Sequence, residues 1–397
     1  GAFEDDRVYQ IASSSKIVIA GIINRLHDDG ILDMYAPISS LVTDWPSIPN
    51  DMSLVQMISN SSGLPGLQSG SNFGSYGCQV NPTDTLQNCA ETILNATPAE
   101  GETIAPPDTV FQYGGAQWQL AGAVVEAVSG KSINELYNEI YAVPCDLTAS
   151  GFSNMIQFGG AFVLYPEAFD GTLDTIVDTA NPFIEAGMYS SVSDYMKILK
   201  MHLDGGVCGI NIVHPPSTIA RMQEDRIKMA WGGSTNSTSI GLQGYGMGWW
   251  IDRNEPTWVT DPGAYGSSPF IDNARGLAVF GALETDFDPA ANVDYLLRLR
   301  AAVTNAVDAI IPPPEAPAAQ PEMPGVNVAI TKFLENNPDL EGAAVTVIHK
   351  YLGVLHHKNY GEFYDERVYA VASASKMVVA GIINHLHDDG ILDMNAP

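Results

Sequence analysis

Apolar residues recur at helical spacing in two long segments of the chain. Ile17–Leu26 reads IVIAGIINRL and predicts a helix that is buried on most of its surface. Val293–Ile310 predicts a second helix. Trp249 and Trp250 would alternate across a strand, and we interpret both as packing residues. These patterns indicate a chain that mixes helices with sheet.

A further helix and a hairpin are predicted after a proline-rich segment. Ile311–Gly325 reads IPPPEAPAAQPEMPG, a composition that favours an extended spacer over a packed core. Val326–Leu334 then predicts a helix. Ala343–His349 and Val354–Tyr360 predict two strands joined by a turn. The proline-rich segment is therefore the expected domain boundary.

The first and last 37 residues of the chain are two copies of one sequence. Gly1–Pro37 and Gly361–Pro397 match without a gap at about 27 of 37 positions. Equivalent residues lie about 360 positions apart, so the repeating unit is a whole domain rather than a solenoid repeat. We expect a domain over 1–310 that lacks its first helix and hairpin, a linker over 311–325, and the start of the next repeat over 326–397. On this interpretation the chain is a window from a longer protein of tandem domains.

The charge of the chain excludes some partners. There are 18 basic and 46 acidic residues, which give a net charge of -28. This excess of acid argues against binding to nucleic acid or to an anionic membrane surface. No apolar run approaches the roughly 18 residues that a membrane-spanning helix needs. No cofactor is expected, and no metal, because the cysteines lack the spacing of zinc ligands.

Cysteines and glycosylation motifs indicate a secreted, extracellular protein. Two disulfides are the natural interpretation, with four free buried thiols as the alternative. The expected pairs are Cys78 with Cys89, which closes a short loop, and Cys145 with Cys208. Three N-x-Ser/Thr motifs predict N-glycans at Asn60, Asn95 and Asn236. Together these features favour an oxidising, glycosylating compartment.

Ser13 and Lys16 form an S-x-x-K pattern at the start of the first predicted helix. One helical turn places the lysine amine beside the serine hydroxyl, where the amine can accept or shuttle the proton of a nucleophile. Ser373 and Lys376 repeat this pair in the second copy. The pattern alone occurs by chance in many proteins, so its neighbours decide its meaning.

The neighbouring segments resemble the serine β-lactamase and penicillin-binding protein superfamily, and class C β-lactamases and family VIII carboxylesterases most closely. The resemblance covers Gly1 to about Ile310 and resumes at Gly325. It implies an α/β (α+β) fold of two lobes, one an antiparallel sheet flanked by helices and the other mostly helical. The segments that carry it, in the family's order, are His27–Val42, Met57–Gly66, Pro107–Ser132 and Glu185–Leu203.

The resemblance also implies roles for individual residues. The family's acylated serine, its lysine proton partner and its tyrosine base or relay correspond to Ser13, Lys16 and Tyr113. The family's oxyanion hole corresponds to the backbone amides of Ser13 and Ala264.

Two motifs depart from the family pattern. The second motif reads Tyr113-Gly114-Gly115 and lacks the family's amide side chain. The third motif reads Asp261-Pro262-Gly263, with a carboxylate where the family has lysine or histidine. A substrate carboxylate, as in a β-lactam or peptide, would meet an anion there. Ester hydrolysis needs no such cation.

Three functions fit the sequence. The repeat, the glycosylation motifs and the altered third motif favour a secreted, glycosylated fibre or matrix of tandem β-lactamase-like domains, with catalysis weak or lost. Its partners would be successive repeats of the same chain and neighbours in the filament. The first alternative is a secreted serine hydrolase, an esterase or peptidase, that uses Ser13, Lys16 and Tyr113. The second is a binding module that retains the pocket without turnover.

Overall fold

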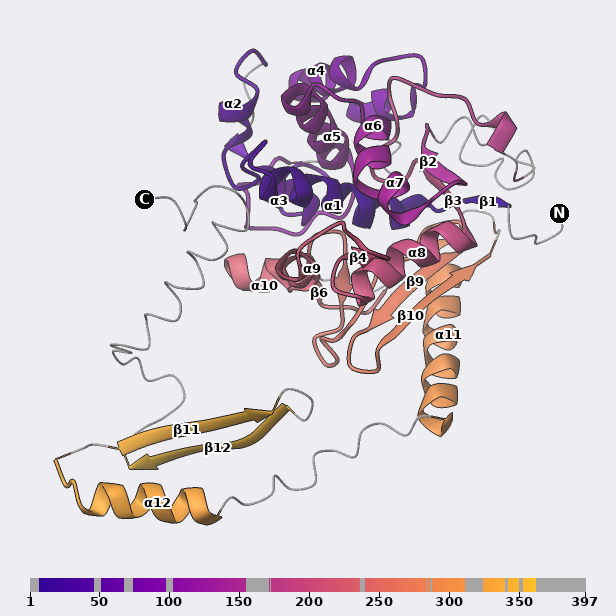
Figure 1. Cartoon of the computed structure of the whole chain (residues 1–397). Coiled ribbons are helices and arrows are strands. Elements are labelled where there is room, and N and C mark those ends of the chain that lie inside the picture. Colours follow the sequence, from indigo (N-terminus) through magenta and orange to yellow (C-terminus); the bar gives the residue numbers. More distant parts are fainter. Residues whose placement is uncertain are drawn as a thin grey trace, which may run out of the picture. The chain divides into compact units, whose positions relative to one another are not determined.

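The computed structural model describes residues 7–45, 51–67, 74–97, 103–154, 171, 173–235, 240–283, 285, 288–310, 324–339, 342–349 and 353–361. The chain divides into two compact units, Gly1–Val307 and Asp308–Pro397. Each unit is described by itself (Figure 1).

The first unit contains a five-stranded antiparallel sheet with the strand order β10-β9-β8-β7-β6. Side chains alternate between its two faces, as they must in a strand. Ile251, Val259 and Ile271 form a row across three strands and join the main core. The strands are β6 Gly244–Tyr245, β7 Trp250–Ile251, β8 Trp258–Thr260, β9 Ser267–Asp272 and β10 Leu277–Ala282.

Helices cover both faces of this sheet. Helix α8 (Val192–Leu203) packs on β9 and β10. Helix α11 (Pro289–Ile310) contributes Leu296 to a separate cluster that includes Trp250, Trp258 and Phe270 from the opposite face. Figure 1 shows α8 and α11 beside β9 and β10. The helix predicted over Val293–Ile310 is thus present and four residues longer at its start.

Helices α2 to α7 belong to a second, mostly helical lobe of the first unit, drawn in indigo to magenta in Figure 1. The predicted α/β fold with two lobes is confirmed. Their bounds are α2 Ile38–Leu41, α3 Leu54–Ile58, α4 Leu86–Asn95, α5 Ala116–Ser129, α6 Ile133–Tyr137 and α7 Val143–Cys145. Helices α9 Pro216–Gln223 and α10 Arg226–Trp231 precede the sheet strands along the chain.

Two small sheets complete the first unit. Strand β3 (Met188–Ser191) lies between β1 (Val8–Gln10) and β2 (Ser150–Phe152), and both pairings are antiparallel. Strands β4 (Val207–Cys208) and β5 (Asn211–Ile212) form a short hairpin. The pairing of β1 with β3 brings the segment before Ser13 beside the segment after Glu185.

Helix α1 (Ser15–Asp28) is the central element of the first unit. Every residue from Ser15 to Asn24 is buried, as expected for a helix that is apolar almost all round. Its side chains share one core with α3, α5 and the sheet. The start of this helix, which carries Lys16, is therefore held from several sides at once.

The second unit contains one helix and one hairpin. Helix α12 (Pro324–Glu335) begins two residues before its predicted start, with proline in its first turn as helix geometry favours. Strands β11 (Gly342–His349) and β12 (Gly353–Gly361) are antiparallel, with an irregularity between Val347 and Ile348. The predicted helix and hairpin are present. Residues 311–323 of the predicted linker and residues 362–397 lie outside the described residues.

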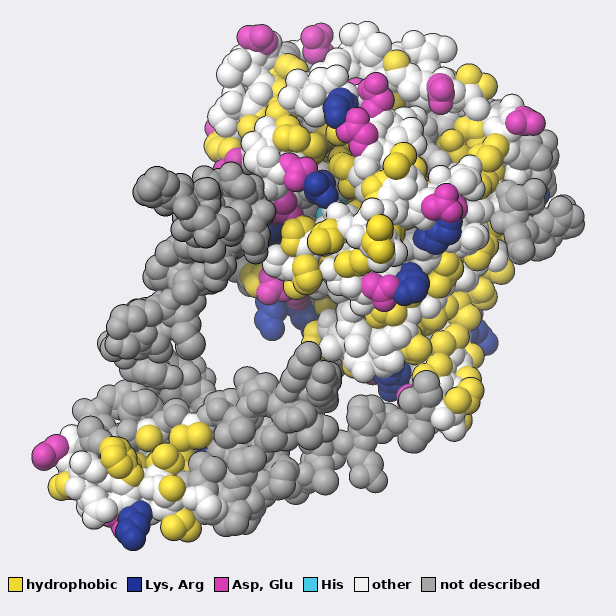
Figure 2. All heavy atoms as spheres, in the orientation of Figure 1, with side chains coloured by type: hydrophobic (Ala, Val, Ile, Leu, Met, Phe, Trp, Pro, Cys, Tyr) yellow, Lys and Arg dark blue, Asp and Glu magenta, His cyan; other side chains and the backbone are white. Residues whose placement is uncertain are grey.

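Both predicted disulfides are present, Cys78–Cys89 and Cys145–Cys208. Among the described helices, none is long and apolar enough to cross a membrane. Figure 2 shows acidic side chains spread over this face of the first unit, with basic side chains between them, rather than gathered into one patch.

Two histidines are buried in the first unit. His214 contacts the Tyr141 hydroxyl through Nε2 at 2.8 Å, and His202 packs edge-on against Trp249. Neither ring nitrogen of His202 has a hydrogen-bond partner among the described residues. Burial lowers the pKa of both histidines to about 3. His214 adds to the shift of His202, and the positive charges of Arg25 and Arg221 add to the shift of His214.

These histidines predict a loss of stability in acid. Below pH 6.5 the unfolded chain protonates them while the folded chain does not, so the free energy of unfolding falls by about 1.4 kcal/mol per pH unit per histidine. The loss continues towards the folded pKa of about 3 and is absent above pH 6.5. Replacing His202 with leucine should reduce the loss between pH 7 and pH 5 by about 2 kcal/mol in urea unfolding. Equal losses in the variant and the parent would contradict this account.

Candidate active site

Ser13 lies in the short turn that joins β1 to α1. Ala12, just before it, has φ 46°, a left-handed conformation that is strained for alanine. The Ser15 hydroxyl donates to the Ala12 carbonyl at 2.6 Å, and the Met188 amide donates to the Ser15 hydroxyl at 3.0 Å. These bonds to both sides of the turn fix the backbone that presents the Ser13 hydroxyl.

Lys16 approaches Ser13 as the S-x-x-K spacing predicts. Its Nζ donates to Ser13 Oγ at 3.1 Å. The same Nζ lies 3.2 Å from the Glu185 carboxylate and donates to the Glu185 carbonyl at 3.0 Å. The side chains of Lys16 and Glu185 are 0% and 1% exposed. An ammonium group this deep needs a partner, and Glu185 supplies it.

Glu185 also occupies the place left by the altered second motif. The Gly115 amide donates to both carboxylate oxygens of Glu185 at 3.1 Å. A Cβ on Gly114 would lie 2.6 Å from Glu185 Oε2, and one on Gly115 would lie 2.7 Å from the Pro65 carbonyl oxygen. Gly114 therefore leaves room for the Glu185 carboxylate, and Gly115 leaves room for the Pro65 carbonyl. Burial raises the pKa of Glu185, while Lys16 and the Gly115 amide oppose this rise.

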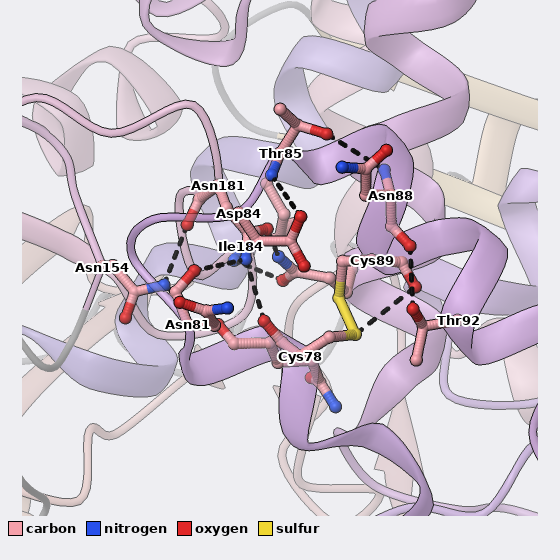
Figure 3. Close-up of a disulfide and its surroundings, with 12 residues drawn as sticks. Cys78, Asn81, Asp84, Thr85, Asn88, Cys89, Thr92, Asn154, Asn181 and Ile184 are labelled. Atoms are coloured by element: carbon pink, nitrogen blue, oxygen red, sulfur yellow. Dashed lines mark hydrogen bonds between the residues drawn. A yellow bond between two sulfur atoms is a disulfide. The ribbon is translucent and has the colours of Figure 1, made fainter.

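The segment that carries Glu185 is anchored at the Cys78–Cys89 disulfide. Figure 3 shows Asn181 beside this disulfide, and Asn181 Nδ2 donates to the Cys78 carbonyl at 2.8 Å. From α5, Gln119 donates to Asn181 Oδ1 at 2.8 Å and accepts from the Ile184 amide at 3.1 Å. The disulfide and α5 thus fix both ends of the short stretch from Asn181 to Glu185.

Tyr113 connects the nucleophile to the third motif. Its hydroxyl donates to Asp261 Oδ1 at 3.3 Å, and the Ser13 side chain on its other side opposes the rise in the pKa of Tyr113. Lys16 Nζ lies 4.8 Å from the centre of its ring. Burial, with the negative charge of Asp261, raises the pKa of Tyr113 well above its ordinary value. A persistent tyrosinate is therefore disfavoured, and Tyr113 suits a relay better than a free base.

The third motif packs directly against the nucleophile turn. Asp261 follows β8, and its carbonyl accepts from the Ser14 hydroxyl at 2.8 Å. A Cβ on Gly263 would lie 2.1 Å from the Ile11 carbonyl oxygen, so only glycine fits there. Asn292 of α11 donates to the Ala264 carbonyl at 2.5 Å and fixes that peptide. The proposed oxyanion amides of Ser13 and Ala264 thus belong to two segments in close contact, and their role stays a prediction.

Aromatic rings enclose Tyr113. Trp250 lies 4.9 Å and Tyr245 lies 6.0 Å from the ring centre of Tyr113, and Phe111 packs on both of them. Trp250 also lies beside the Asp261 carboxylate and opposes the rise in its pKa.

The other predicted site residues fare differently. Ser373, Lys376 and Asn236 lie outside the described residues. Asn95 is exposed at the end of α4, where an N-glycan has room.

Asn60 is fully buried, and its Oδ1 accepts from the Gly114 amide at 2.9 Å and the Trp118 indole at 2.8 Å. The prediction of a glycan on Asn60 conflicts with this packing. The described residues contain no group of three or more histidine, cysteine, aspartate or glutamate residues arranged to hold a metal.

Sequence reasoning missed Glu185, the residue with the most contacts to Lys16. A signal was present, because Glu185 is a lone charged residue in the apolar stretch PFIEAGM. A charge in such a stretch becomes buried with it and then requires a partner of opposite sign. Its partner lies 169 positions away, which no local pattern reveals.

The sequence pattern of the Beta-lactamase family matches residues 2–303, and the chain belongs to this family. Penicillin-binding protein 4 of Amycolatopsis lactamdurans is 22% identical over 301 residues, 72% of this chain and 74% of that protein. A protein of Cochliobolus lunatus named probable hydrolase clz13 is 22% identical over 355 residues, 77% of this chain but only 55% of that protein.

The crystal structure of EstCE1, described as a hydrolase with promiscuous acyltransferase activity, has the same fold. Its TM-score is 0.56 at 19% sequence identity, and the match covers 76% of this chain and 85% of EstCE1. At this identity the likeness establishes the fold alone.

A side chain at position 115 should disturb both the fold and the site. Gly115 has φ 81° and faces the Pro65 carbonyl, whereas Gly130 has φ 69° and open space around it. Gly115→Ala should therefore lower the free energy of unfolding by about 1–3 kcal/mol more than Gly130→Ala, since Gly115 combines a glycine-only backbone conformation (φ 81°, ψ -163°) with a steric clash, whereas Gly130 is left-handed helical with open space around it. Chemical denaturation of the two variants measures the difference. Equal losses would mean that the backbone at Gly115 moves away freely.

Proposed function

We propose that this protein is a serine hydrolase or acyltransferase that acts on uncharged esters, with Ser13 as the nucleophile. The observation that carries the proposal is the buried Lys16 amine, 3.1 Å from Ser13 Oγ and tied to Glu185. An amine beside a serine hydroxyl one helical turn away is an arrangement that supports a serine nucleophile. The names of the probable hydrolase clz13 and of EstCE1, a hydrolase with promiscuous acyltransferase activity, agree with hydrolysis or acyl transfer.

The preference for uncharged esters follows from the charges around Ser13. Asp261 stands where the family has a cation, and Glu185 is a second carboxylate at the site. Lys16, the basic residue that contacts these groups among the described residues, is already paired. A substrate carboxylate would find no free cation and two acidic side chains, which disfavours β-lactams and peptide C-termini.

A fluorescent fluorophosphonate tests this proposal on the intact native protein. We expect labelling of the peptide that contains Ser13, and loss of that label in Ser13→Ala, because the reagent reacts with activated serines. Peptide mapping separates Ser13 from Ser373, since the neighbouring residues differ.

The matched control for labelling is Ser39→Ala, which removes an exposed serine of α2 and should leave the label in place. If folded protein stays unlabelled at Ser13, the site is inert. A binding module that retained the pocket would then be the better account.

We propose a second function for the full protein, a secreted, glycosylated fibre of tandem β-lactamase-like domains. The observation that favours it is the second copy of Gly1–Pro37 at Gly361–Pro397, with about 27 of 37 positions identical. The two disulfides and the exposed Asn95 fit an oxidising, glycosylating compartment. A fibre of this kind is compatible with active or inactive domains.

Electron microscopy of the native protein tests the fibre. Long regular filaments with about one domain per axial repeat are expected, because whole-domain repeats joined by linkers stack in one dimension. A field of dispersed single particles would rule the fibre out and leave the hydrolase proposal intact.

A further inference from the structure

Packing alone does not explain why a carboxylate stands at position 261 of the site. Its side chain is fully buried, and Oδ1 accepts from the Tyr113 hydroxyl at 3.3 Å. Its Oδ2 has no hydrogen-bond partner within the described part of the chain. A buried carboxylate with an unsatisfied oxygen costs free energy, which a neutral or apolar residue would avoid.

The backbone around Asp261 is fixed relative to the nucleophile. Its carbonyl accepts from the Ser14 hydroxyl, which also contacts the Ser267 hydroxyl at 2.8 Å. Ser267 in turn donates to the Ile11 carbonyl at 2.7 Å. Residues on both sides of Ser13 are thus tied to the strand ends that hold Asp261. Asp261 and Ser13 therefore keep a constant separation, with Tyr113 between them.

Lys16 is poorly placed to act as the proton acceptor. Its amine is within 3.2 Å of the Glu185 carboxylate and 3.0 Å of the Glu185 carbonyl. Its contacts are all with oxygen acceptors, so the amine is placed to donate hydrogen bonds rather than to accept one. Lys16 can donate to Ser13 Oγ and stabilise negative charge that develops there.

We propose that Asp261 is the terminal proton acceptor for Ser13 and that Tyr113 relays the proton between them. This inference rests on the proposed hydrolase function. Asp261 touches neither substrate nor nucleophile and acts through Tyr113. The carboxylate that replaced the family's cation would thus have a chemical role in addition to excluding anionic substrates.

Ester cleavage through this relay restores Ser13, Tyr113 and Asp261 to their starting protonation states. Ser13 Oγ attacks the carbonyl carbon, its proton passes to the Tyr113 oxygen, and the Tyr113 proton passes to Asp261 Oδ1. The bond from the carbonyl carbon to the alcohol oxygen then breaks, and the proton returns along the same route to the departing alkoxide. Water repeats the sequence on the acylated Ser13, releases the carboxylic acid and restores the serine.

The relay requires an ionised Asp261, so the rate should rise with pH. Burial raises the pKa of Asp261 well above its ordinary value, and Glu185 adds to the rise, while Lys16, Tyr113 and Trp250 oppose it. Tyr195 of α8 and Tyr245 of β6 also face the Asp261 charge. The midpoint of the rise in kcat/KM should therefore lie above the ordinary pKa of an aspartate.

The test measures kcat/KM for p-nitrophenyl acetate against pH in the full-length protein and in its variants. Asp261→Asn should lower kcat/KM by about 100-fold or more on the alkaline side and abolish the rise with pH. Tyr113→Phe should do the same, and the double variant should be no worse than either, because the two groups act as a unit. Asp252→Asn, which removes a half-buried carboxylate paired with Arg300, is the matched control and should keep the parental profile.

The outcomes separate the two proposals. If the parent neither turns over the ester nor reacts with fluorophosphonate at Ser13, the proposed function fails. If the parent is active but Asp261→Asn keeps its rate and pH profile, the relay is wrong and the hydrolase stands. A kcat/KM of the parent that does not change with pH across the acidic and neutral range would also overturn the relay. This measurement does not depend on whether any variant folds.

Discussion

The buried ion pair between Lys16 and Glu185 is the interaction on which the site depends. Both side chains are almost completely removed from water, and their nearest charged atoms are 3.2 Å apart. Removing one partner from such a pair costs about 3–5 kcal/mol, because the other is left as an uncompensated buried charge. The pair also sets the position of the amine beside Ser13, so folding and nucleophile geometry are secured together.

Any contact that fixes the position of Glu185 therefore also helps to fix the Lys16 amine beside Ser13. The Gly115 amide donates to its carboxylate, and the absence of a side chain at Gly114 makes space for it. The disulfide loop and α5 hold the segment from Asn181 onwards. The second motif lacks the amide side chain of the family. The Glu185 carboxylate, from another part of the chain, contacts the motif instead. The altered third motif also makes a new contact, because the Asp261 carboxylate accepts a hydrogen bond from Tyr113 at the position where the family has a cation.

Local patterns were enough to predict several helices, the hairpin and the pairs that lie close in sequence. The S-x-x-K spacing placed Lys16 beside Ser13, and Cys78 paired with Cys89 across a short loop, while Cys145 and Cys208 were the two cysteines that remained. Contacts between distant segments were beyond such patterns. Glu185 reaches Lys16 across 169 positions, and Asp261 reaches Tyr113 across 148. Asn60 carried a glycosylation motif that its burial against Trp118 overrules, since a tripeptide pattern contains no information about exposure.

The most direct test of an active Ser13 is to trap its acyl intermediate. The intact protein would be mixed with a p-nitrophenyl ester, quenched in acid within the first turnover, digested and analysed by mass spectrometry. We predict one acyl group on the peptide that contains Ser13, with a matching early burst of p-nitrophenol. Ester turnover without acylation of Ser13, or folded protein that shows neither, would contradict a nucleophilic Ser13 activated beside the Lys16–Glu185 pair.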